Sequence, residues 1–345
     1  MIGRRSLLMG ALSVPLLGAA AGESPLRIGV LSDLTGPLAQ QGKRQLLGAQ
    51  HRAGSGGHGH GGGVELMPAD AAETPEDAVF GLLEQGVHGL ILLSSAKSIV
   101  DAANASCTPA LTTGKAEGPY VFQAGPSPGQ VAQAMMQALK TGGVSKAGVM
   151  SLGDPPPDLA DAALNRGITL TGAESFDATA TDLTSVAATL IEGAPEAIVV
   201  AAPPPFDGYA ARDARAAGFT GPIMFPPSAV NPGFHGVAGP GADGSKAVAP
   251  WAASAAEPPA DLPNATVIRR FKEGFTPANG APGASESMAA DAVALLQLAF
   301  LGHRDRKQAK AQLDQMCCVG VCGVYNPQLG DDALTVLTSA DGAWG

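Results

Sequence analysis

The chain has 345 residues and a formal net charge of −10 at pH 7; 45% of its residues are hydrophobic and only 4% are aromatic. An acidic chain without a lysine or arginine cluster does not fit nucleic acid or an anionic lipid surface, so we expect neither as a partner. The length exceeds that of a usual single core and favours two lobes of roughly 100–200 residues each, with mainly aliphatic cores.

Residues 1–21 have the pattern of an export signal. Arg4-Arg5 form a charged start, residues 7–18 an apolar stretch too short to span a bilayer, and residues 19–21 a small-residue cleavage site. The arginine pair fits both the twin-arginine and the Sec export routes. No cysteine follows the apolar stretch and no later segment suits a membrane span, so we expect a periplasmic protein without a lipid anchor.

Strand and helix patterns alternate along the rest of the chain. The first strand, Leu26–Leu31, leads through the turn Thr35-Gly36-Pro37 into a helix that starts near Leu38. The next predicted elements, in chain order, are a strand at 64–67, a helix at 78–85 with its N-cap at Thr74, a strand at 87–93, a helix at 96–105, and strands at 109–111 and 120–123.

The same alternation then starts again. We predict helices at 129–139, 158–165, 181–191 and 207–217, and strands at 146–151, 168–172, 197–201 and 222–225. The last predicted elements are a strand at 246–250, helices at 266–275 and 285–301, and a hairpin of 317–324 with 333–337. Repeated β-α alternation predicts an α/β protein with two parallel, doubly wound sheets.

The opening segment, Leu26–Gly42, resembles the first strand, turn and helix of the branched-chain amino-acid receptors of bacterial ABC importers, the leucine/isoleucine/valine-binding family. Further similar segments are Gly61–Leu66, Pro68–Asp70, Thr74–Ala78, Ala211–Phe219, Ser287–Leu296 and Val321–Thr338. The resemblance implies a type I periplasmic-binding-protein fold, with a hinge between two lobes that the chain crosses three times. It assigns residues 22–124 and 252–317 to the first lobe, and residues 125–251 and 318–345 to the second.

The resemblance also implies a function. We expect a periplasmic receptor that binds a small polar solute between its lobes and delivers it to the permease and ATPase subunits of an ABC importer. Such a receptor is expected to be a monomer without a cofactor. No common nucleophile-elbow, P-loop or zinc-protease motif is present in the sequence, so we expect no enzymatic activity.

The predicted ligand residues follow from the family positions and from the ends of predicted strands. Two hydroxyl pairs correspond to the family's carboxylate-binding strand ends, and they fit N-caps or turns as well. Asp154 and Asp207 follow predicted strands and either face a cation or begin a helix. The predicted residues are Gln41, Ser94, Ser95, Thr112, Thr113, Asp154, Phe206, Asp207 and Ser228.

At two of these positions, the side chain differs from the one that the family uses to bind an amino acid. Gln41 stands in place of a wall aromatic, and Ser228 stands where a carboxylate would bind the ligand ammonium. An unpaired buried charge costs several kcal/mol. We therefore expect leucine, isoleucine and valine to bind weakly or not at all.

Histidines and cysteines support an alternative function, a periplasmic sensor or metal-handling protein. His58 and His60 lie in a Gly-rich loop, which fits either metal binding or an ordinary surface turn. Cys107, Cys317, Cys318 and Cys322 form an even set in an oxidising compartment, so we predict a disulfide from Cys322 to Cys317 or to Cys318. A thiolate metal site and buried free thiols are the alternatives.

Overall fold

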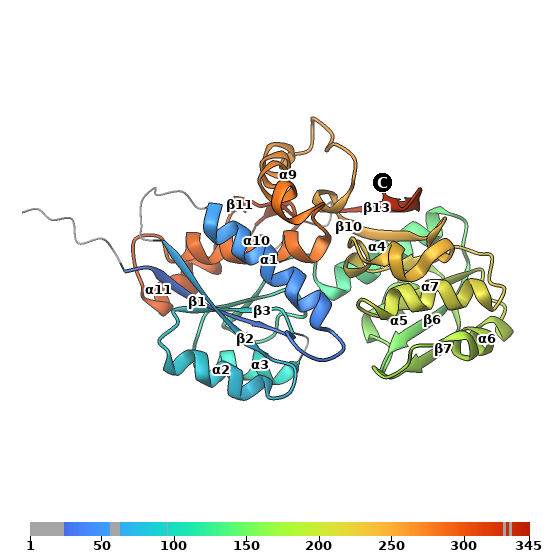
Figure 1. The fold of residues 1–345 in the computed structure, drawn as a ribbon, viewed down its shortest axis with the longest axis horizontal. Helices are drawn as coiled ribbons and strands as arrows, with labels where there is room; N and C mark the ends of the chain where they lie inside the picture. The colour runs from blue at the N-terminus through green and yellow to red at the C-terminus, as the bar shows by residue number, and fades with distance from the viewer. Residues whose placement is uncertain (1–23, 56–62, 95, 327–328, 331–332) are drawn as a thin grey trace, which may run out of the picture.

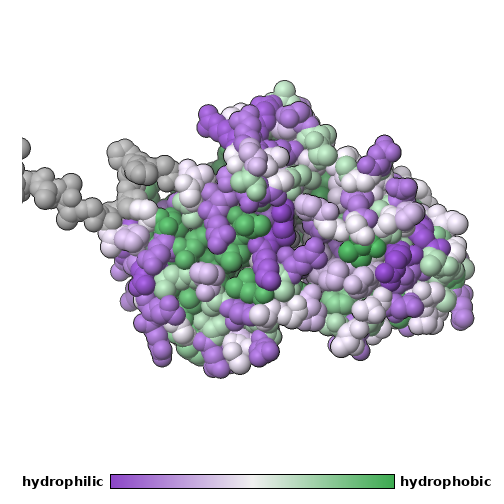
Figure 2. Space-filling model, in the orientation of Figure 1, coloured by the Kyte–Doolittle hydropathy of each residue, from purple (hydrophilic) through white to green (hydrophobic). Residues whose placement is uncertain are grey.

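The computed structural model describes residues 24–345 except 56–62, 95, 327–328 and 331–332, and it forms two α/β lobes (Figure 1). The predicted export signal, His58, His60 and Ser95 lie outside the described residues. The two lobes form separate masses in the space-filling view, and hydrophilic residues cover much of this face (Figure 2). Among the described residues, no helix combines the length and apolar character that a membrane span requires.

The first lobe contains a five-stranded parallel sheet in the order β2-β1-β3-β4-β5. Successive side chains of a strand point to opposite faces. Ile28 and Ile91 therefore pack on the face covered by α1 and α10, and Leu90 and Leu92 on the face covered by α2 and α3. The strands are β1 (Leu26–Ser32), β2 (Val64–Asp70), β3 (Gly89–Leu92), β4 (Ala110–Thr112) and β5 (Val121–Gln123).

Six helices accompany this first sheet, with α1 and α10 on one side and α2 and α3 on the other (Figure 1). They are α1 (Ala39–Ser55), α2 (Pro75–Glu84), α3 (Lys97–Ala105), α9 (Ala265–Asn279), α10 (Ala284–Ala299) and α11 (Arg306–Leu313). The helix α2 begins with Thr74 at its N-cap and Pro75 at its first turn, as the sequence predicts.

The second lobe contains a seven-stranded sheet in the order β14-β13-β10-β9-β8-β6-β7. The strands β6 to β10 are parallel, whereas β13 pairs antiparallel with β10 and β14 antiparallel with β13, so the sheet is mixed. Its members are β6 (Lys146–Leu152), β7 (Thr169–Phe176), β8 (Ala197–Ala201), β9 (Ile223–Phe225), β10 (Lys246–Pro250), β13 (Leu334–Ala340) and β14 (Ala343–Trp344).

Helices cover both faces of the second sheet. Val199 of β8 packs with α4 and α5, and its neighbour Val200 packs with α6 and α7 on the opposite face. The helices are α4 (Pro128–Thr141), α5 (Pro157–Arg166), α6 (Thr184–Glu192), α7 (Phe206–Ala216) and α8 (Phe234–Ala238). Three short 3₁₀ turns follow β9 and β10, at η1 (Pro227–Ala229), η2 (Gly239–Ala242) and η3 (Trp251–Ala253).

The predicted hairpin of 317–324 with 333–337 is not formed. Instead β11 (Cys318–Val319) pairs with β12 (Val324–Tyr325), and β13 pairs with β10 in the second sheet. The physical reason is that β10 would otherwise leave a row of unpaired backbone groups at the sheet edge, which β13 covers.

The chain passes between the two sheets three times, after β5, after β10 and between β12 and β13. Residues 318–325, expected in the second lobe, contact the first. Asp291 of α10 accepts hydrogen bonds from the backbone N–H groups of Val321 and Cys322 at 2.7 and 2.8 Å and from the Tyr325 hydroxyl at 3.0 Å. These contacts attach the segment to α10.

Candidate ligand cleft between the lobes

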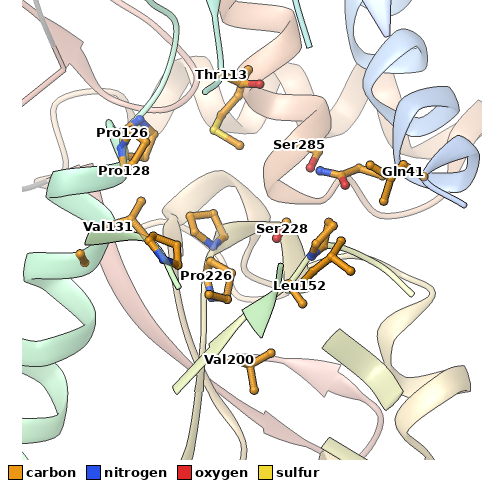
Figure 3. A pocket seen from close by; sticks show the side chains of 18 of the residues that line it. Gln41, Thr113, Pro126, Pro128, Val131, Leu152, Val200, Pro226, Ser228 and Ser285 are labelled. Atoms are coloured by element: carbon orange, nitrogen blue, oxygen red, sulfur yellow. The ribbon is translucent and has the colours of Figure 1, made fainter. Parts of the chain in front are cut away.

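A cavity of about 450 Å³ lies between the two lobes. It is lined by residues at the carboxyl ends of strands from both sheets, which is where open α/β sheets bind ligands. Figure 3 shows Thr113, Gln41 and Ser285 of the first lobe facing Ser228 and Pro226 of the second. The polar lining residues are Asp33, Gln41, Gln45, Thr113, Asp158, Ser228 and Ser285.

Two glycines of α1 bring the first-lobe part of the lining together. A Cβ on Gly42 would lie 2.0 Å from the backbone oxygen of Asp33, and one on Gly48 would lie 2.2 Å from that of Glu286. Only glycine permits backbones to approach this closely. The end of β1, the start of α1 and the start of α10 therefore meet at the cleft.

Four polar side chains in the lining have no hydrogen-bond partner within the described part of the protein. They are the amide of Gln41 and the hydroxyls of Thr113, Ser228 and Ser285. The Gln41 side chain points toward Ser285, and Ser228 approaches from the opposite lobe (Figure 3). These groups are available to a ligand, because folding has not used their hydrogen-bonding capacity.

The rest of the lining is aliphatic and rich in proline. Among the described residues that form it, there is no aromatic and no cationic side chain. Pockets of this kind bind an apolar ligand body and use a few polar groups for orientation. The apolar members include Leu38, Leu93, Val131, Leu152, Leu159, Val200, Met288 and the prolines 126, 128, 156, 203, 226 and 227.

The cleft contains two carboxyl groups, one from each lobe. Asp33 directly follows β1, and Asp158 lies in the first turn of α5. Burial raises the pKa of Asp33, a hydrogen bond from the Ser94 hydroxyl opposes this effect, and the nearby charge of Asp70 adds to it.

The comparisons with known proteins agree with this architecture. Residues 25–328 match the family model described as periplasmic binding protein. The chain belongs to this family. No match was found among the curated proteins.

Solved structures share the fold at low sequence identity. A leucine-binding protein from Thermotoga maritima is 20% identical, with a TM-score of 0.79 over 93% of this chain and 97% of that one. An extracellular ligand-binding receptor from Rhodopseudomonas palustris HaA2 is 15% identical, with a TM-score of 0.83 over 93% and 99%. A solute-binding protein from R. palustris in complex with benzoate is 18% identical, with a TM-score of 0.79 over 93% and 95%.

Three of the predicted ligand residues of this periplasmic binding protein line the cleft, namely Gln41, Thr113 and Ser228. Ser94 and Thr112 instead stabilise turns, since Ser94 accepts a hydrogen bond from the Ala96 N–H at 3.4 Å. Thr112 donates to the Leu92 carbonyl at 3.2 Å and accepts from the backbone N–H two residues later at 3.0 Å. The Thr112 hydroxyl therefore serves the backbone, whereas the Ser94 hydroxyl both accepts from a turn and donates to the Asp33 carboxylate in the cleft.

The predicted second-lobe residues lie elsewhere. Asp154 is exposed and outside the lining, which Pro156 and Asp158 form instead. Phe206 and Asp207 point into the second-lobe core, contrary to the prediction. Phe206 is a core residue because it packs against two aromatic rings, those of Phe176 and Tyr209, at centroid distances of 6.1 Å each.

Asp207 lies in the first turn of α7, so the helix-start explanation fits it. Its carboxylate accepts a hydrogen bond from the Gly208 N–H at 2.6 Å, and its second oxygen has no partner in the described structure. Burial raises its pKa to about 8. Of the two roles expected of Asp207, the structure places it at the helix start, buried and outside the cleft lining.

Four polar lining residues were missed: Asp33, Gln45, Asp158 and Ser285. The place of Asp33 in the cleft could have been predicted from the sequence, since it directly follows the first strand of an α/β sheet. Ser285 lies at the start of α10, far from Asp33 along the chain, and only the tertiary fold brings it to the cleft.

The four cysteines are free in the structure, so the predicted disulfide is not formed. Cys322 is buried beside Asp291, whereas Cys107 and Cys317 are exposed and Cys318 is half-buried. The alternative of a buried free thiol thus fits Cys322 alone. In the described ranges, no group of three or more histidine, cysteine or acidic side chains is placed to hold a metal ion.

A side chamber of about 310 Å³ adjoins the cleft and shares Gln41, Ser228 and Ser285 with it. It contains Arg44, whose guanidinium pairs with Glu286 and donates to the carbonyl oxygens of Asn279 and Ala281 at 3.1 and 3.2 Å. The positive charge of Arg44 is therefore used to join α1 to the start of α10.

Proposed function

We propose that this periplasmic binding protein is the exported receptor of an ABC importer, which binds one small molecule in the cleft and presents it to the permease and ATPase subunits. One observation supports the proposal above all. Unpaired polar side chains from both lobes, Gln41, Thr113 and Ser285 on one and Ser228 on the other, face a single cavity of about 450 Å³. Unpaired groups facing a cavity are typical of a binding site.

The lining favours a ligand with an apolar body and few polar groups. This ligand is more apolar than the small polar solute that the sequence suggests, because aliphatic and proline side chains form most of the cleft. The similar structures carry titles that name a leucine-binding protein and a complex with benzoate. Leucine and benzoate each combine an apolar part with a charged group, and the aliphatic and proline walls of this cleft would hold an apolar part of that kind.

The mechanism we propose is closure of the two lobes around the ligand. A molecule that contacts Gln41 on one lobe and Ser228 on the other gains more contacts when the lobes close. Such a ligand shifts the population toward the closed form by its differential affinity for that form. The importer would then recognise the closed receptor.

The test is native mass spectrometry of protein purified from the periplasm without refolding, followed by X-ray scattering. We expect a monomer that carries one small molecule, and a radius of gyration that falls when this molecule is added back to stripped protein. A scattering profile that is unchanged at saturating ligand would contradict the proposal. N-terminal sequencing of the same material should give a chain that begins near Gly22, and recovery only from membranes would contradict export as a soluble receptor.

A further inference from the structure

The side chamber beside the cleft contains a hydrogen-bond acceptor that the fold leaves unused. Glu286 lines the chamber and is fully buried, and its Oε1 atom pairs with the guanidinium of Arg44. Its second carboxylate oxygen, Oε2, has no hydrogen-bond partner within the described structure. A buried charged oxygen without a donor costs free energy, so a donor from a bound molecule would be favourable at this position.

This oxygen lies where the two lobes meet. A Cβ on Gly283, at the start of α10, would lie 2.8 Å from Oε2 of Glu286 and 2.5 Å from the backbone oxygen of Val230 on the opposite lobe. Any residue other than glycine would therefore collide with the carboxylate and with the second-lobe backbone. A group bound at Oε2 would thus be enclosed by both lobes.

The chamber favours a neutral donor over an ion. Arg44 and Glu286 are the charged residues of its described lining, and they pair with each other, so an ion of either sign meets a like charge as well as the opposite one. The Asn231 amide is already used, since it donates to the Ser228 carbonyl at 2.9 Å and accepts from the Gly233 N–H at 2.8 Å. A hydroxyl or an amide N–H group suits the unused acceptor.

One molecule can occupy the cleft and the chamber together, because Gln41, Ser228 and Ser285 line both spaces. We propose, building on the receptor function above, that the side chamber is a second subsite, in which Glu286 accepts a hydrogen bond from a neutral hydroxyl or amide N–H group of the ligand. The ligand then has an apolar body in the cleft and this donor at its far end.

Three probes test the subsite: hexanoate, ω-hydroxyhexanoate and ω-methoxyhexanoate. They share a saturated chain and a carboxylate, and they end in a methyl group, a hydroxyl donor and an ether that only accepts. Calorimetry with the stripped wild-type protein should rank ω-hydroxyhexanoate first, at least about tenfold tighter than the other two, because its hydroxyl donates to a charged group. Equal affinity for all three probes, or binding by none of them, would overturn the proposal.

The variant Glu286→Gln reverses the polarity of the acceptor. Its amide oxygen can still accept from Arg44, which places the amide N–H₂ group at the position of Oε2. We expect affinity for ω-hydroxyhexanoate to fall at least about tenfold, while ω-methoxyhexanoate binds equally or more tightly. An equal loss for all three probes would give Glu286 a structural role alone and overturn the proposal.

The variant Gly233→Leu tests the chamber without changing its charges. Gly233 lines the chamber and is outside the cleft lining, and a Cβ there would lie 2.7 Å from the flexible end of the Gln40 side chain. The leucine should fill the chamber and lower affinity for ω-hydroxyhexanoate at least about tenfold, with hexanoate within about twofold.

Gly236→Leu is the matched control, since a Cβ there has open space around it and the residue lines neither the cleft nor the chamber. It should leave affinity for every probe within about twofold. Equal effects of Gly233→Leu and Gly236→Leu on ω-hydroxyhexanoate would overturn the subsite. If Glu286→Gln does not fold, the probe ranking on the wild-type protein and Gly233→Leu decide.

The two proposals fail in different ways. A crystal structure with ω-hydroxyhexanoate should place its hydroxyl within hydrogen-bond distance of Oε2 of Glu286. A bound molecule confined to the cleft, with only an ordered water on Oε2, would overturn the subsite and leave the receptor function standing. A protein that carries no small molecule and keeps its scattering profile with all three probes would contradict the receptor function and the subsite with it.

Discussion

The two lobes contribute different chemistry to the cleft. The first lobe supplies most of the polar lining, with Asp33, Gln41, Gln45, Thr113 and Ser285. The second supplies prolines and aliphatic side chains, and Asp158 and Ser228 are its polar members in the described lining. A ligand head group would therefore find its partners on the first lobe, and closure of the second would mainly exclude water.

The lining residues also differ in what they do for the fold. Leu159 and Val200 of the second lobe belong to hydrophobic cores beneath the cleft surface. Gln41 and Thr113 of the first lobe are half-buried polar residues whose side-chain hydrogen bonds are unused in the described structure. Substitutions on the second lobe should thus change stability, and substitutions on the first should change affinity.

The largest expected effect is on stability and comes from Leu159→Ala. Leu159 is 4% exposed and packs in the core formed by α4, α5 and the second sheet. Truncation loses buried apolar contacts and leaves a cavity, so the free energy of unfolding of the ligand-free protein should fall by about 2–4 kcal/mol. Urea unfolding, followed by circular dichroism, measures it.

Leu164→Ala is the matched control on the same helix. Leu164 is 79% exposed, so the same truncation there should change the free energy of unfolding by less than about 0.5 kcal/mol. Equal effects at the two positions would show that the second-lobe wall is not part of the core.

The second-lobe core also contains the carboxyl group of Asp207, and burial disfavours the ionised form of this group. Burial raises the pKa of Asp207 from 3.8 to about 8, so between these values the folded protein holds a proton that the unfolded chain releases. Stability is therefore lost as the pH rises toward 8. We expect Asp207→Asn to raise the free energy of unfolding at pH 8 by about 1–3 kcal/mol, with the gain shrinking toward pH 4.

Asp213→Asn, on the same helix, should act in the opposite direction. Asp213 is also buried, but it accepts hydrogen bonds from the Leu183 N–H and the Arg212 guanidinium, both at 2.7 Å. Its replacement weakens these charge-assisted bonds and should lower stability. Urea unfolding at several pH values compares the variants, and a loss of stability in Asp207→Asn at pH 8 would contradict the expected sign.

Most of the fold follows from local patterns in the sequence. The apolar run around Leu90, the Thr74-Pro75 helix start and the alternation of strands with helices predicted the two sheets and their helices, because these signals depend on neighbouring residues. The helix α11 was missed, since its sequence is mainly polar and shows little periodicity. The pairing of β13 with β10 was also missed, because strand pairing depends on residues that are far apart in the sequence.

The site was less predictable than the fold. Strand-end positions pointed to Thr113, which lines the cleft, but they did not separate it from Thr112, whose hydroxyl serves a turn. Adjacent strand residues point to opposite sides, so an error of one residue moves a side chain out of the site. Asp207, in the first turn of α7, and its neighbour Phe206 both face the core rather than the cleft.

The smallest expected effect concerns the polar lining of the first lobe and comes from the variant Gln41→Leu. The Gln41 amide points toward Ser285 in the cleft, and no protein group within the described ranges uses its hydrogen bonds (Figure 3). Leucine there would leave a polar group of the ligand unpaired, so affinity for the co-purified ligand should fall by about 0.5–1.5 kcal/mol, with the fold's stability unchanged. Calorimetry measures the loss, and Gln50→Leu, at an exposed position of α1, is the control. If both variants bind the ligand as tightly as the wild type, the polar groups of the first lobe do not orient it, and the apolar walls of the second lobe supply most of the affinity.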